Sequence, residues 1–259
     1  EAADAALRVG VEGGKRAPAQ VARARRELLR LRALVRLVRG PLGSTAFARE
    51  HGAVQRLIRR ITPHAEGVDA AALRALAKIG KGPDGAPPAG PARAAGKIPA
   101  RRSAGPGPAL LRALADLAEI RVRAAHWHVP EAGIEDLAPA LRSAWRQSTR
   151  PLTGARSATP AALADAAFTL HDQLRCIERV WPEAIDAPRQ LARTLAADAT
   201  RLAALDVLPT DDAPGLRKAL DHARKQAAAE VDEAAALLRA EAPAAFTRRV
   251  AAYWSCWRA

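Results

Sequence analysis

One amphipathic run determines how this chain folds: Val21-Ala-Arg-Ala-Arg-Arg-Glu-Leu-Leu-Arg-Leu-Arg-Ala-Leu-Val-Arg-Leu37. Its apolar seam repeats at alternating spacings of three and four residues, at Val21, Ala24, Leu28, Leu31, Val35 and Val38. This is the period of a helix with one buried face, so the run predicts a helix over residues 18–39. Gly40, Pro41 and Gly43 are expected to end that helix, because neither residue type continues one well.

The same period indicates helices along most of the remaining chain. They are expected over 44–61, 68–79, 109–126, 134–150, 159–180, 187–205, 213–240 and 243–257. No segment shows the sustained alternation with period two that is typical of strands. Abundant Ala, Leu and Arg with only 3% aromatic residues also favour helices. The sequence therefore predicts an all-α fold of packed helical bundles.

A change of composition divides the chain near its middle. Residues 80–108 contain seven Gly and seven Pro among 29 residues, too many for a helix or a central strand. We interpret this segment as a basic linker or long loop. The predicted organisation is a basic first helical bundle over 1–79, the linker over 80–108 and a second helical bundle over 109–259.

The positive charge is concentrated in the first third of the chain. The whole chain carries 41 Lys and Arg against 27 Asp and Glu, a net charge of +14. Residues 15–60 hold 13 Lys and Arg and only two acidic residues, and residues 78–108 contribute a further +5. Residues 109–183 hold nine of each sign. Such concentration indicates an anionic partner for the first two helices.

Composition and missing motifs exclude several classes of protein. A hydrophobic content of 49% excludes global disorder, and no apolar run is long enough to span a membrane. Two cysteines are too few for a disulfide framework, so we expect a reducing, cytoplasmic compartment. No Walker loop, zinc-protease motif or nucleophile elbow is present, so we expect no enzyme activity and no cofactor. His126 and His128 would diverge on a helix, so no metal site is expected.

An arginine stripe is the most distinctive feature of the first helix. Arg25, Arg32 and Arg36 lie on one helical face with Arg39, and Arg26 and Arg30 belong to a second row beside it. Like charges at this spacing repel, and arginine binds phosphate through two hydrogen bonds. The alternative is a solvated face that reflects an arginine-rich composition. The scarcity of acids over residues 15–60 favours an anion site.

A second stripe follows at Arg142, Arg146 and Arg150, spaced i, i+4 and i+8. Its surroundings are neutral overall, so exposed charges paired with nearby acids remain an alternative to a second anion-binding row.

The residues that carry these patterns resemble a known family, the conserved-histidine α-helical (CHAD) domains. The run over 21–37 is similar to the family's first helix, in which Val-His-x-x-Arg is followed by basic residues and Leu-Arg-Ala-x-x-Arg-Leu. Later segments resemble the family in the expected order, at Phe47-Ala-Arg-Glu50, Leu57-Ile-Arg-Arg60, Ala138-Pro-Ala-Leu-Arg-Ser-Ala-Trp-Arg146, Val180-Trp-Pro182 and Pro243–Trp254. The resemblance covers most of residues 18–257.

This resemblance implies one domain of two antiparallel helical bundles, related by pseudo-twofold symmetry around a basic central cleft or pore. It implies binding of long-chain inorganic polyphosphate without catalysis. Carried over by position, the binding residues of the first half are Arg25, Arg26, Arg30, Arg32 and Arg36, and those of the second half are Arg142, Arg146 and Arg150.

Several positions depart from the family pattern. Ala22 stands where the namesake histidine is expected, and Leu29 where a basic residue is usual. In the second copy of the motif, Ala161 and Ala164 replace the histidine and the arginine, and Asp165 has the opposite charge. We therefore expect weaker or one-sided polyphosphate binding, or a role in another interaction.

The sequence leads to a non-enzymatic polyphosphate-binding module that is cytoplasmic and associates with polyphosphate granules. One alternative is an interaction or granule-associated helical protein with an eroded anion site. The other is non-specific nucleic-acid binding, which the shortage of aromatic residues in the basic segment disfavours.

Overall fold

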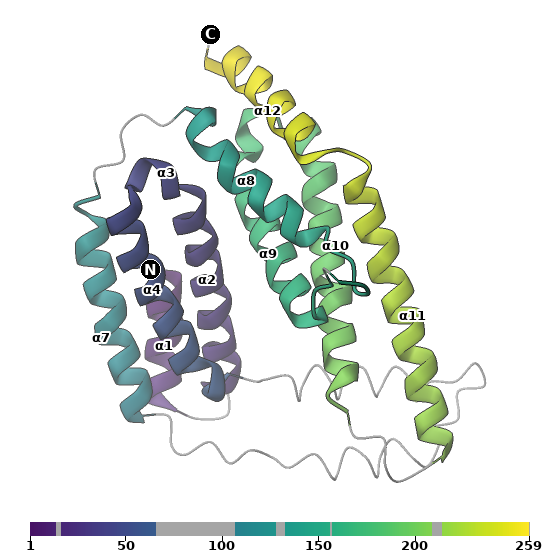
Figure 1. Ribbon diagram of the computed structural model, residues 1–259. Helices are drawn as coiled ribbons and strands as arrows, with labels where there is room; N and C mark the ends of the chain where they lie inside the picture. Colours follow the sequence, from purple (N-terminus) through teal and green to yellow (C-terminus); the bar gives the residue numbers. More distant parts are fainter. Residues whose placement is uncertain (14–16, 66–106, 128–132, 156, 209–213, 259) are drawn as a thin grey trace.

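The computed structural model describes residues 1–13, 17–65, 107–127, 133–155, 157–208 and 214–258 (Figure 1). The expected helix over 68–79 and most of the expected linker lie outside these residues. The described residues form helices and no strand, so the predicted all-α class is confirmed. None of the described helices is both long enough and apolar enough to cross a membrane.

Ten α-helices and two 3-10 turns make up the described part of the chain. Their bounds are α1 Ala2–Glu12, α2 Ala17–Leu37, α3 Arg39–Leu42, α4 Ser44–Ile61, η1 Thr62–His64, α7 Gly107–Ala124, α8 Ile134–Ser148, α9 Pro160–Ile177, η2 Glu178–Val180, α10 Pro182–Asp206, α11 Pro214–Arg239 and α12 Pro243–Arg258. Between α3 and α4, Gly43 has a φ of 78°, a left-handed conformation that glycine adopts at no steric cost.

The first core joins α1, α2, α4 and α7. Its fully buried side chains include Leu7, Leu28, Leu57 and Leu110, one from each helix. Helix α1 was not expected from the sequence, because it is short, rich in alanine and has only one large buried residue, Leu7. Gly10 lets α1 lie close to α2: a Cβ at this position would lie only 2.9 Å from Val21 Cγ2.

Helix α7 belongs to the first core and not, as the expected domain division has it, to the second bundle. It begins at Gly107 and packs against α1 and α4, although residues from 109 onward were expected in the second bundle. The reason is the apolar face of α7, which completes the first core. The boundary between the two cores therefore does not coincide with the expected linker in the sequence. A buried carboxylate also ties α7 to α4. Glu50 accepts hydrogen bonds from Arg123 Nε at 2.9 Å and from Arg49 Nε at 2.7 Å.

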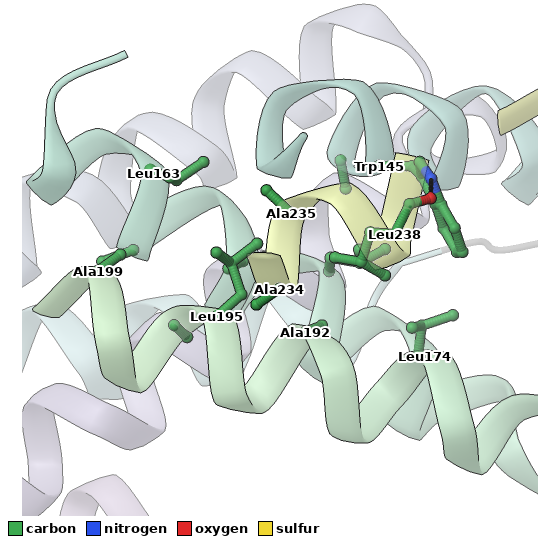
Figure 2. Packing of buried hydrophobic residues seen from close by; sticks show 14 of the residues in the cluster. Trp145, Leu163, Leu174, Ala192, Leu195, Ala199, Ala234, Ala235 and Leu238 are labelled. Carbon is green, nitrogen blue, oxygen red and sulfur yellow. Dashed lines mark hydrogen bonds between the residues drawn. The ribbon is translucent and has the colours of Figure 1, made fainter. Parts of the chain in front are cut away.

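The second core consists of α8 to α12 (Figure 2). The indole of Trp145 is buried against Phe246, with ring centroids 4.3 Å apart, and its Nε1 donates to the Leu238 carbonyl at 3.1 Å. Helix α10 begins at Pro182, five residues before the expected start, because proline is well accommodated in a first turn. Pro188 lies within α10, and Arg249 Nη1 donates to the Ala184 carbonyl one turn earlier, at 3.4 Å.

Helix α2 belongs to both cores. Val21, Ala24 and Leu28 lie in the first, whereas Leu37 lies in the second and Val38, just after the helix, packs against it. The helix therefore packs along α9 as well as along α1 and α4, and it lies between the two groups of helices in Figure 1. This position places its arginine face beside α9.

Replacing Trp145 tests the second core. Trp145→Ala removes a fully buried indole, its ring contact and its hydrogen bond, so unfolding free energy should fall by about 3–5 kcal/mol. Urea unfolding measures the change. The matched control is Trp257→Ala, because the Trp257 side chain is 58% exposed, and its loss should stay below about 1 kcal/mol. Equal losses for the two variants would contradict this account of the core.

Candidate functional site

The candidate site is the junction where the arginine face of α2 meets α9. Arg32 forms an ion pair with Asp165, and its side chain is only 12% exposed. One turn and two turns further along α9, Thr169 and Gln173 are also buried. Gln173 Nε2 donates to the Ala33 carbonyl of α2 at 3.3 Å. A polar stripe of α9 therefore covers the arginine face of α2.

Arg25 and Arg36 lie on either side of Arg32 in the sequence and contact neutral groups. Arg25 Nε donates to Thr62 Oγ1 at 3.2 Å, and Arg36 Nε donates to His51 Nε2 at 3.3 Å. Within the described residues, neither makes an ion pair. Among the residues that the structure describes, these three partly buried guanidinium groups therefore share the field of one carboxylate, that of Asp165.

This shortage of negative charge affects the arginines themselves. Burial lowers the pKa of the Arg25 guanidinium; Asp165 opposes that effect and the charge of Arg32 adds to it. Burial also lowers the pKa of Arg36, and Arg32 lowers it further. A cation that has lost hydration without gaining a carboxylate is destabilised, and a bound anion would offset that cost. Arg32 Nε is moreover a buried N–H with no hydrogen-bond partner among the described residues.

A cavity of about 640 Å³ opens next to Arg36, between α2, α3 and α4 on one side and α8 and α9 on the other. Four side chains form a continuous column along its basic wall. The guanidinium of Arg39 lies 5.0 Å from the centre of the Phe47 ring, and Phe47 stacks on His51 with centroids 5.1 Å apart. His51 in turn accepts the hydrogen bond from Arg36.

The other predicted site residues lie elsewhere. Arg26 is exposed, and Arg30 contacts Glu27 at 2.7 Å and Asp172 at 3.7 Å. Arg142 and Arg146 are exposed on α8 and are not among the residues that line the cavity. Arg150 Nη2 donates to the Ser157 carbonyl at 3.1 Å. The structure thus brings together Arg25, Arg32 and Arg36, and it does not bring the arginines of α8 to them.

Sequence reasoning missed several residues of this junction. Asp165 was recognised only as a departure from a family pattern, and Thr169 and Gln173 were not singled out. Their spacing of four residues along α9 was the available signal, because it places Asp165, Thr169 and Gln173 on one face of the helix. His51 had a weaker signal, since it follows Phe47 by one turn on a strongly basic helix.

Comparison with known proteins identifies no relative: no family model, no curated protein and no solved structure matches this chain. In the part of the chain that the structure describes, no three His, Cys, Asp or Glu side chains gather in a way that could hold a metal ion. The chemistry of the junction therefore depends on its arginines, His51 and the polar stripe of α9.

The pKa of His51 reports the electrostatic field of the junction. Burial lowers the pKa of this imidazole below its usual value, and the charge of Arg36 lowers it further. Arg36→Gln should therefore raise the pKa of His51, as followed by NMR titration of the imidazole. The control is Arg142→Gln, which removes the same charge outside the cavity lining and should leave this pKa unchanged. An unchanged value in Arg36→Gln would contradict the described contact.

Proposed function

We propose that this chain is a divergent CHAD-like domain that binds inorganic polyphosphate and catalyses no reaction. One observation carries the proposal: Arg25, Arg32 and Arg36 are partly buried in a row at one junction, with Asp165 as the ion-pairing carboxylate. From Arg25 to Arg36 an α-helix rises ~16 Å, a length that several linked phosphates could follow. Each guanidinium can donate two charge-assisted hydrogen bonds to phosphate oxygens.

The proposal includes the arrangement that the family resemblance implies. The two described cores, joined through α2, support a pair of bundles related by pseudo-twofold symmetry around a basic cleft. In that arrangement the α2–α9 junction is the centre of the cleft. The arginines come from the first half, whereas α9 contributes Asp165, so binding is one-sided.

The remaining predicted arginines are proposed as outer contacts. Arg26 is exposed next to the junction row, and Arg30 already has two acidic partners. Arg142, Arg146 and Arg150 would meet only a chain long enough to pass beyond the junction. Binding of such long chains would also bring the protein to polyphosphate granules in the cytoplasm.

Removing the row should abolish binding. A variant with Arg25, Arg32 and Arg36 all changed to Gln is expected to lose at least about a hundredfold in affinity for long-chain polyphosphate, because charge-assisted contacts contribute most of the binding energy. Fluorescence anisotropy at several salt concentrations measures the affinity for polyphosphate. The control changes Arg193, Arg217 and Arg248, three exposed arginines of α10, α11 and α12, and removes the same charge.

The wild-type protein provides the decisive comparisons for this proposal. Affinity should increase with chain length and fall steeply with salt, since each phosphate contact releases counterions. Duplex DNA at equal phosphate concentration should not displace polyphosphate. Displacement would favour non-specific nucleic-acid binding. A failure of both anions to bind would favour a helical interaction protein with an eroded anion site.

Asp165 should weaken the binding of any polyanion at this row. Its carboxylate pairs with Arg32, so an incoming phosphate has to displace it or lie beside it. Asp165→Asn keeps the shape and removes the charge, and polyphosphate affinity should rise about threefold to thirtyfold, as one charged contact becomes available. Asp116→Asn is the matched control, because Asp116 pairs with Arg60 in the first bundle and has similar exposure. A decrease in affinity for Asp165→Asn would contradict this role.

A further inference from the structure

The cavity beside α3 has a basic wall, and neither of its two arginines, Arg36 and Arg39, forms an ion pair with a described residue. Their positions are set by other contacts, since Arg36 donates to His51 and Arg39 lies over Phe47. Two guanidinium groups held by neutral partners leave their remaining N–H donors to an anion.

The opposite wall is different in character. Helix α8 contributes three polar side chains, Asp136, Ser143 and Gln147, and between them the apolar residues Pro139, Ala140 and Ala144. Gln147 Nε2 donates to Ser143 Oγ at 3.1 Å, and Asp136 Oδ2 accepts from the Gly133 amide at 3.1 Å. The Asp136 carboxylate would repel a second phosphate. Hydroxyl groups, in contrast, can donate hydrogen bonds to the Asp136 carboxylate and to Gln147 Oε1. This wall therefore suits hydroxyls.

We propose that this cavity is a binding site for a small phosphate monoester of a polyol, such as a sugar phosphate. The phosphate lies against Arg36 and Arg39, and the hydroxyl-bearing body lies against Asp136, Ser143 and Gln147. A volume of about 640 Å³ fits the size range of small-molecule sites and exceeds what a single phosphate fills. The site shares Arg36 with the proposed polyphosphate row but not Arg25 or Arg32, so it stands even if polyphosphate does not bind.

Isothermal titration of the full chain tests the ligand class. The probes are glucose 6-phosphate, glycerol 3-phosphate, myo-inositol 1-phosphate, glucose and orthophosphate. At least one ester should bind at least about tenfold more tightly than orthophosphate, because its hydroxyls add hydrogen bonds, and glucose should not bind measurably. Orthophosphate binding as tightly as every ester, or no binding by any ester, would overturn the proposal.

A second experiment distinguishes a soluble phosphate ester from a phosphorylated lipid head group. Vesicles that display phosphatidylinositol 4-phosphate present the same chemistry on a membrane surface. Sedimentation with these vesicles, lost in Arg39→Gln, would assign the site to a lipid head group. Binding of soluble esters alone would assign it to a free metabolite.

Two single variants separate this site from the polyphosphate row. Arg39→Gln should lower the affinity for the best ester at least about tenfold, while polyphosphate affinity changes less than about threefold. Arg25→Gln should do the reverse, because Arg25 does not line the cavity. Both variants should melt at the wild-type temperature, which excludes misfolding. If each variant weakened both ligands by the same factor, the cavity would not be a separate site.

Discussion

The pairing of α2 with α9 is the constraint on which the rest of the structure depends. Helix α2 carries an apolar seam and an arginine face. The seam has to be buried, while the arginines still need hydrogen-bond partners or water. Leu28 of the seam lies in the first core, and Val38 at the end of the seam packs against the second. The polar stripe of α9 covers the arginines, through the ion pair of Arg32 with Asp165 and the hydrogen bond from Gln173 to Ala33.

This covering is incomplete in charge, and that incompleteness gives the junction its chemistry. Among the described residues, Asp165 is the carboxylate that pairs with Arg32 and acts on Arg25 and Arg36. Burial lowers the pKa of His51, and the charge of Arg36 lowers it further. Full neutralisation would have produced a structural ion-pair network with no capacity for an anion. Complete exposure would have produced a solvated charged face with little affinity for one. Partial burial with a charge deficit lies between these limits, and the proposed phosphate site rests on this arrangement.

The two proposed sites divide the basic surface of the first half. The row on α2 is linear and is proposed to bind a long polyanion, whereas the cavity beside α3 is compact and has polar groups of α8, among them Asp136, opposite its two arginines. Arg36 belongs to both, because it lies at the end of the row and at the mouth of the cavity. Binding of a ligand at one site should therefore lower the affinity of the other site for its ligand, and by the same factor in both directions.

Much of this could be predicted from residue order alone. The period of three and four residues from Val21 to Val38, and similar patterns later in the chain, determined the all-α class and most helix bounds to within a few residues, because local burial sets that period. Helix α1 was not predicted, because it is only 11 residues long and Leu7 is its one large buried residue. The concentration of charge on residues 15–60 likewise led to the prediction of an anionic partner for the first two helices, and this stays a prediction.

Only the tertiary structure decided which groups meet those arginines. Asp165 lies 133 residues from Arg32, and α7 follows a long segment yet completes the first core, so neither contact has a local signature. The second stripe also repeats at helical spacing, but Arg142 and Arg146 lie on an exposed face of α8. Periodicity shows which residues share a face of a helix; packing between distant helices decides what that face touches, and charge repulsion or pairing follows from the contact.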